Sequence, residues 1–180
     1  VIDLSHYNVV DNLEEADKFG IWGVIHKATE GKTVVDKKME ARRFLTDRAG
    51  LLWGTYHFIR AGNISAQVNH YLNIAKVGPN DLMALDWEDN KVSVAAAKDW
   101  LIRVTDKIGR KPIIYSGNTA KELIKGVDQF LGSHRLWLAQ YGSNPTIQRS
   151  WKEFWLWQFT GDGKGPQPHM VPGIAIPGNK

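Results

Sequence analysis

Two acidic side chains stand two residues apart where an apolar run ends. In the segment LMALDWEDN (residues 82–90), the apolar run is followed by Asp86 and Glu88. Side chains alternate between the two faces of a strand, so Ala84, Asp86 and Glu88 share one face. If the small Ala84 points into a barrel, both acids lie at the carboxyl end of an inward-facing strand, where barrel enzymes build their active sites. Close, partly desolvated carboxyls titrate as a coupled pair, which provides an acid and an anion near neutral pH.

Glycoside hydrolysis uses this combination, since one group protonates the leaving oxygen and the other meets positive charge at the sugar carbon. Residues i and i+2 of a strand have Cα atoms roughly 6.5–7 Å apart, which is long for a nucleophile and acid whose carboxyls lie ~5–5.5 Å apart. The spacing favours a substrate-assisted route, in which the sugar's acetamide attacks, Asp86 orients it and Glu88 donates the proton. From spacing alone, a strand that simply ends in polar residues, with Asp86 capping a turn and Glu88 solvated, is equally well supported.

A third acid favours the catalytic interpretation. Asp3 lies in the opening segment VIDLS, where it shares a strand face with Val1 and Ser5. A barrel brings together strand ends that are distant in sequence. Three inward-facing acids are difficult to explain as structural residues, so we predict that Asp3, Asp86 and Glu88 form one cluster.

Aromatic residues at the ends of predicted strands provide walls against which sugar rings can stack. In GTYHF the small Gly54 shares a face with aromatic side chains, and WLAQY repeats the pattern around Ala139. We assign to a sugar site Tyr56, Tyr115, Trp137 and Tyr141. We assign to the core Trp22, Trp53, Trp100 and Trp151. Gln158, in FWLWQFT, is a candidate for holding a sugar hydroxyl or amide, but the pattern leaves open which face of its strand points inward.

The elements that must position these residues alternate between apolar, β-branched runs and amphipathic stretches, which is typical of β/α units around a parallel sheet. We predict strands at about Val1–Leu4, Gly23–Ala28, Leu51–Phe58, Leu82–Trp87, Pro112–Ser116, Arg135–Gln140 and Phe154–Phe159. We predict helices at about Asp11–Phe19, Lys37–Arg48, Ser65–Ala75, Ser93–Ile108 and Thr119–Val127. The helices stop after Val127, and the Gly/Pro-rich tail after Thr160 is expected to be irregular. Five β/α units followed by plain strands predict one α/β domain over residues 1–180, a barrel that has lost its last helices.

Composition excludes several other chemistries. The chain has no cysteine, which rules out disulfides, thiolate chemistry and zinc sites built on sulfur. The six histidines show no HExxH or similar spacing, and glycine-rich phosphate loops and nucleophile elbows are missing. We therefore expect no cofactor and no metal. His57 is the one histidine that we place beside the proposed site.

Charge and hydropathy narrow the set of partners. The formal charge of +4 and the pI of about 9.2 favour an anionic partner. The basic residues are nevertheless spread out, with only short pairs such as Lys37-Lys38, so they indicate solvated helix faces rather than a nucleic-acid track. No segment approaches the ~18 apolar residues of a membrane span. The chain opens on Val1 instead of a methionine and enters a strand-like pattern at once, which is compatible with removal of a leader or upstream region and leaves export undecided.

Seven segments in order resemble glycoside hydrolase family 25, the Chalaropsis-type lysozymes: VIDLSHYN, GVIHKATEG, GTYHF, LMALDWEDN, PIIYSG, LWLAQY and LWQFTGDG. The resemblance implies a TIM-like (β/α)5β3 barrel and retaining hydrolysis of the β-1,4 bond between N-acetylmuramic acid and N-acetylglucosamine in peptidoglycan. It also implies roles for matching positions. Glu88 would be the general acid/base, Asp86 its partner carboxylate and Asp3 a supporting acid. The sugar groove would be lined by Tyr56, Tyr115, Trp137, Tyr141 and Gln158, with Lys27 as a weaker candidate.

The end of the chain departs from the family pattern. Family members usually finish with a strand carrying an Asp-x-Asn element, whereas this sequence finishes in PGIAIPGNK. It is therefore open whether GIAI supplies the eighth strand. The leading hypothesis is a monomeric muramidase, secreted or part of a phage lysin, that acts on peptidoglycan glycan strands and binds no nucleic acid or membrane. The alternatives are a wall-binding module with weakened chemistry and a chitinase-like hydrolase of acetamido sugars.

Overall fold

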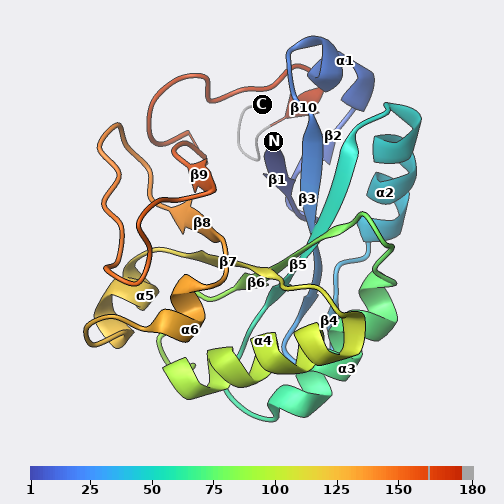
Figure 1. The fold of residues 1–180 in the computed structure, drawn as a ribbon. Coiled ribbons are helices and arrows are strands. Elements are labelled where there is room, and N and C mark those ends of the chain that lie inside the picture. Colours follow the sequence, from blue (N-terminus) through green and yellow to red (C-terminus); the bar gives the residue numbers. More distant parts are fainter. Residues whose placement is uncertain (162, 176–180) are drawn as a thin grey trace.

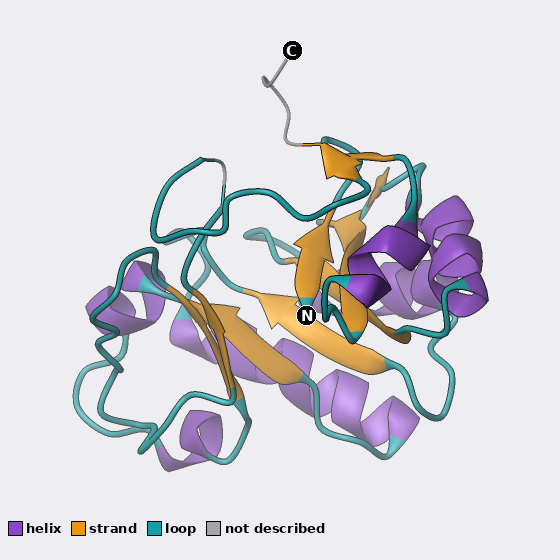
Figure 2. Ribbon diagram, turned by 90° about the horizontal axis from the view of Figure 1, so that it is seen from above, coloured by secondary structure: helices purple, strands orange, loops and turns teal. Residues whose placement is uncertain are grey.

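A curled parallel sheet forms the centre of the molecule in a computed structural model that describes residues 1–161 and 163–175. Each neighbouring pair of strands along this sheet runs parallel. In spatial order the strands are β1 (Ile2–Leu4), β3 (Gly23–Glu30), β5 (Leu52–Phe58), β6 (Leu82–Asp86), β7 (Ile113–Ser116), β8 (Leu136–Ala139) and β9 (Leu156–Gln158). The strands curl around a common interior and the helices lie on the outside (Figures 1 and 2). The predicted TIM-like α/β fold is thereby confirmed.

The helices occur where the amphipathic stretches predict them. They are α1 (Leu13–Lys18), α2 (Met39–Arg48), α3 (Ile64–Ala75), α4 (Val94–Ile108), α5 (Asn118–Leu123) and α6 (Gln129–Gly132). The first five connect successive strands of the sheet. The expectation that helices stop after Val127 is wrong, because α6 forms one further turn that the Asp128 side chain caps by accepting from Leu131 N at 3.0 Å.

Three two-residue strands were not predicted. β4 (Val34–Val35) runs antiparallel to β3, and β10 (Ile174–Ala175) runs antiparallel to β2 (Val9–Val10). The described part of GIAI therefore pairs with β2 in a separate small sheet instead of extending the parallel one; Ile176 lies outside the described residues. Gly173 allows this pairing because it has no side chain. Its carbonyl accepts from Asp11 N and Asn12 N, and a Cβ at this position would lie 1.8 Å from the carbonyl oxygen of Asn12.

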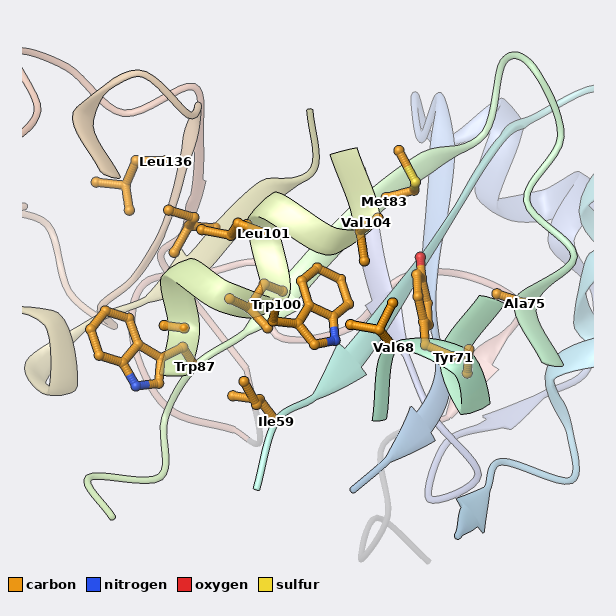
Figure 3. Close-up of a cluster of buried hydrophobic side chains, with 14 of the residues drawn as sticks. Ile59, Val68, Tyr71, Ala75, Met83, Trp87, Trp100, Leu101, Val104 and Leu136 are labelled. Carbon is orange, nitrogen blue, oxygen red and sulfur yellow. The ribbon is translucent and has the colours of Figure 1, made fainter. Parts of the chain in front are cut away.

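The main core lies between the sheet and the outer helices (Figure 3). Trp100 and Leu101 of α4 are fully buried and pack in one cluster with Tyr71 of α3. Ser93 caps α4 by accepting from Ala96 N at 3.2 Å, and Gly109 ends the helix in the left-handed conformation. Because these helices cover the outer face of the sheet, its inner face is left for a second, smaller cluster.

The core assignment of four tryptophans is correct for three of them. Trp53, Trp100 and Trp151 are buried, but Trp22 is 74% exposed. Trp22 lies just before β3, at the amino-terminal edge of the sheet, where its carbonyl accepts from Leu52 N at 2.9 Å while the indole remains outside. Within the described ranges, no helix has the length and apolar character needed to cross a membrane.

Candidate active site

Strand register brings the predicted site residues onto one inner face. Tyr56 of β5 is paired with Ala84 of β6, and two positions further on Asp86 is paired with Tyr115 of β7. Tyr115 is paired in turn with Trp137 of β8. Neighbours in register on parallel strands point to the same side of the sheet. The inner cluster consists of Ile25, Ala84, Ile113, Tyr115 and Trp137, with half-buried Tyr56, Leu82, Ala139 and Leu156 around it.

Asp86 is the last residue of β6 and lies almost fully buried, with 5% of its surface exposed. Its Oδ1 has no hydrogen-bond partner among the described residues. Burial raises the pKa of Asp86 well above its ordinary value, and the nearby charge of Glu88 raises it further, whereas Lys27 opposes the shift. Asp86 is thus a buried carboxyl group, one oxygen of which accepts no hydrogen bond from the described residues.

Glu88 lies beyond the end of the strand. β6 ends at Asp86, so the prediction that it continues to Trp87 is one residue too long. Trp87 instead turns its indole to the outer side, where Nε1 donates to Val92 O at 3.0 Å. As a whole residue, Glu88 is exposed at the carboxyl end of the sheet, while surrounding groups cover part of its carboxyl. Partial burial of its carboxyl and the negative charge of Asp3 raise the pKa of Glu88.

Asp3 and Gln158 meet across the two outermost strands of the sheet. Gln158 Nε2 donates to Asp3 Oδ2 at 2.9 Å, and Gln158 Oε1 accepts from the Tyr115 hydroxyl at 2.7 Å. This places the Gln158 side chain on the inner face of β9, which the sequence pattern left open. The three residues form a chain of hydrogen bonds from β7 through β9 to β1.

The aromatic candidates differ in their exposure. Tyr115 and Trp137 are buried, with ring centroids 4.5 Å apart in an edge-to-face arrangement. Burial, with added effects of the neighbouring acids, raises the pKa of both Tyr56 and Tyr115 well above its ordinary value, so both hydroxyls remain protonated donors. Tyr141 lies beyond β8 and is 38% exposed. Tyr56, Tyr115 and Trp137 therefore form the floor of the candidate site, while Tyr141 lies at its rim.

Lys27 belongs to an ionic network that sequence reasoning missed. Its Nζ donates to Glu30 Oε2 at 2.6 Å, and the other Glu30 oxygen accepts from Arg60 Nε and Nη2 at 2.9 and 2.7 Å. Arg60 Nη1 also donates to Asp89 Oδ2 at 3.2 Å. The sequence offered only a positional signal for this network: Glu30 lies three residues after Lys27 in the HKATEG segment, and Asp89 directly follows Glu88.

His57 lies on the wrong side of the sheet for the role we considered. Alternation along β5 turns Tyr56 inward, and so turns His57 outward beneath α3 and α4. There its Nδ1 lies 2.7 Å from Thr29 Oγ1, its Nε2 lies 3.1 Å from Gln67 Oε1, and its ring stacks on Trp100 at a centroid distance of 5.6 Å. Burial lowers the pKa of His57 to about 4. In the part of the chain that the structure describes, no group of three or more His, Asp or Glu residues is arranged to hold a metal ion.

The sequence of this chain is similar to that of a known family and of several known proteins. The sequence profile of glycosyl hydrolases family 25 matches residues 2–167. The uncharacterized protein YegX of Escherichia coli K12 is 32% identical over an alignment of 122 positions that covers 64% of this chain and 44% of YegX. Lysozyme M1 of Streptomyces globisporus is 25% identical over an alignment of 185 positions that covers 91% of this chain and 62% of that protein. The chain thus spans less than two thirds of the length of either relative.

Solved structures share the architecture. A muramidase from Trichobolus zukalii superposes with a TM-score of 0.78 at 31% identity, over 88% of this chain and 85% of that one. A family GH25 lysozyme from Aspergillus fumigatus superposes with a TM-score of 0.80 at 28% identity, over 92% of both chains. A bacterial lysozyme from Streptomyces coelicolor has a TM-score of 0.81 over 98% of this chain and 91% of that one; its 21% identity supports likeness of fold alone.

Proposed function

The chain belongs to glycosyl hydrolases family 25, and from this premise we propose that it is a lysozyme that hydrolyses the β-1,4 bond between N-acetylmuramic acid and N-acetylglucosamine in peptidoglycan. The observation that carries the proposal is the buried Asp86, whose Oδ1 lacks a partner among the described residues, within range of the Glu88 charge. A buried acceptor without a donor is costly. Substrate N–H groups can supply that donor.

Glu88 is the proton donor in this proposal. The charge of Asp3 and partial burial raise its pKa, which keeps its carboxyl protonated closer to neutral pH. Its position at the exposed carboxyl end of the sheet leaves it accessible to a glycan strand. As the C1–O4 bond breaks, Glu88 gives its proton to the departing O4, so that the leaving sugar departs as a neutral alcohol.

Asp86 orients the substrate's acetamide. In the free protein, burial raises the pKa of both carboxyl groups, and the charge of Glu88 raises that of Asp86 further. An acetamide N–H donated to Asp86 Oδ1 favours the carboxylate form of Asp86 and so favours the proton on Glu88. The acetamide oxygen then attacks C1 as O4 leaves, giving an oxazolinium ion next to the Asp86 anion.

Water completes the reaction with retention. The Glu88 carboxylate, deprotonated in the first step, accepts a proton from a water molecule whose oxygen attacks C1. The bond between C1 and the acetamide oxygen breaks, and Glu88 is again protonated. Two successive inversions at C1 yield a product with the original configuration.

The walls of the proposed groove come from the inner-face aromatics. Tyr56 retains a hydroxyl proton that can be donated to a sugar oxygen, whereas Tyr115 already donates its proton to Gln158. Half-exposed Tyr141 offers a ring face at the rim. In this proposal Gln158 and Lys27 act less directly than the sequence suggested. Both are already bonded within the protein, Gln158 to Asp3 and Tyr115, and Lys27 to Glu30.

The test compares the wild type with Glu88→Gln on purified peptidoglycan, following loss of turbidity and identifying the released reducing ends. Glutamine keeps the shape of the side chain but cannot donate a proton to O4. We expect reducing-end muramic acid from the wild type and none from the variant. Binding of the wall without cleavage by the wild type would instead support a binding module, and preferential cleavage of chitin oligomers would support a chitinase-like hydrolase.

A further inference from the structure

The loop that carries Glu88 is held on one side by β7 and the start of α5. Trp87 N donates to Tyr115 O at 2.9 Å, and Ser116 Oγ donates to Trp87 O at 2.7 Å. Thr119 Oγ1 donates to the carbonyl of Glu88 itself at 2.8 Å. Because β6 ends at Asp86, strand pairing does not hold Glu88. These bonds instead fix its backbone against β7.

The opposite side of the loop is held by Arg60. The preceding residue, Ile59, donates its N–H to Asp86 O at 3.0 Å, so Arg60 follows β5 at the level where β6 ends. Arg60 Nη1 then reaches Asp89 Oδ2 at 3.2 Å. The other oxygen of Asp89 accepts from Lys91 N at 3.0 Å and shapes the turn after Glu88. One carboxylate therefore both forms the turn and ties it to Arg60.

Arg60 is itself fixed from β3. Its Nε and Nη2 both donate to Glu30 Oε1, and its guanidinium lies over the ring of Phe58 with a centroid distance of 4.4 Å. Lys27 occupies the remaining oxygen of Glu30. The planar guanidinium thus has its donors directed at two carboxylates at once, an arrangement that a lysine ammonium cannot reproduce.

This network contributes more to geometry than to folding stability. The Arg60 side chain is 47% exposed, and ion pairs with such exposure stabilise proteins only slightly. A small displacement of a group that transfers a proton, in contrast, greatly lowers a reaction rate. A bridge that joins the end of β3 to the residue after Glu88 is placed to prevent such a displacement.

We propose that Arg60 is a positioning residue for the general acid: by bonding Glu30 and Asp89 together, it holds the Glu88 loop over the carboxyl end of the sheet. The inference rests on the proposed function of Glu88. It assigns the Lys27 and Glu30 side chains to the support of Arg60 instead of to direct contact with sugar.

The test uses Arg60→Gln, Arg60→Lys and Asp89→Asn, with Arg103→Gln as matched control. Arg103 also makes a carboxylate pair, with Asp99 at 2.9 Å, but on the exposed surface of α4. On soluble glycan fragments of peptidoglycan we expect kcat to fall roughly tenfold or more in Arg60→Gln and Asp89→Asn, with KM changed by less than about twofold. Arg60→Lys should recover only part of this loss, and Arg103→Gln should keep the kcat of the wild type.

Amide hydrogen exchange supplies a readout that needs no activity. Residues 87–92 should exchange faster in Arg60→Gln and Asp89→Asn than in the wild type, whereas Arg103→Gln should leave this segment unchanged. Unchanged exchange in residues 87–92 or a wild-type kcat in Arg60→Gln would overturn the inference. If the wild type does not cleave peptidoglycan, the proposed function fails, and hydrogen exchange still decides whether Arg60 holds the loop.

Discussion

Gln158 Nε2 donates a hydrogen bond to Asp3 Oδ2 over 2.9 Å, and these residues belong to β9 and β1, the two outermost strands of the parallel sheet. Within residues 1–161 and 163–175 no backbone ladder joins β9 to β1. The side-chain bond therefore crosses the gap at which a complete barrel would close. Tyr115 donates to the same amide from β7, so it fixes the orientation in which Gln158 meets Asp3.

Replacement of Gln158 by leucine should lower both stability and activity. The change leaves Asp3 Oδ2 and the Tyr115 hydroxyl without the Gln158 amide, which costs about 1–3 kcal/mol for half-buried or buried polar groups. Gln148→Leu is the matched control, because that buried amide bonds Gly126 and Ser150 away from the proposed site. Urea denaturation and turnover of peptidoglycan should show that both variants lose stability but only Gln158→Leu loses activity. Equal activities would argue against a role for this bond in the site.

Removal of the Asp3 charge should shift the pH profile to more acidic values. The negative charge of Asp3 raises the pKa of Glu88, so Asp3→Asn should lower it. Because Glu88 must carry a proton to act as the acid of the proposed mechanism, activity should then be lost at a lower pH than in the wild type. The measurement is the alkaline limb of kcat/KM against pH for both proteins. An alkaline limb at unchanged pH would exclude Asp3 as the group that sets the protonation of Glu88.

Substrates without a 2-acetamido group should not be cleaved. In the proposed route the acetamide oxygen is the nucleophile. Asp86 Oδ1, which accepts no hydrogen bond from the residues that the structure describes, accepts from the acetamide N–H. A glycan of the same linkage with a 2-hydroxyl group supplies neither, so no reducing ends should be released above background. Its efficient hydrolysis would indicate instead that Asp86 attacks C1 directly. Cleavage of the acetamido glycan under the same conditions is the positive control.

The parts of the fold that sequence predicted depend on local patterns. Alternation along β5 and β7 is enough to put Tyr56 and Tyr115 on the inner face, since side-chain direction in a strand depends only on position. The same rule explains why His57 faces outward, because it directly follows the inward-facing Tyr56 on the strand. The buried apolar face of α4 can likewise be predicted from the helical spacing of its apolar residues alone.

The parts that sequence missed depend on contacts between distant segments. Gln158 meets Asp3 across 155 positions, and Arg60 meets Glu30 across 30. Neither contact leaves a local pattern, because strand register and loop path decide it. Trp22 illustrates the reverse error, since its apolar side chain predicts burial while its place before β3 leaves it outside the core. The pairing of Ile174 with Val10 was equally difficult to predict, because the sequence of this segment is compatible both with this pairing and with an eighth strand of the parallel sheet.

Acidification should destabilise the protein through His57. The folded-state pKa of about 4 lies below the ordinary 6.5, because burial under α3 and α4 disfavours the imidazolium. Between these values only the unfolded chain binds the proton, so stability is complete above pH 6.5 and is lost as pH falls toward 4. A shift of this size corresponds to about 3 kcal/mol at pH 4. Urea denaturation of the wild type and His57→Gln between pH 5 and 7 isolates this effect, because the carboxyl groups contribute to both proteins alike. The free energy of unfolding should fall more steeply with acid in the wild type, and parallel curves would mean that folding does not change the pKa of His57.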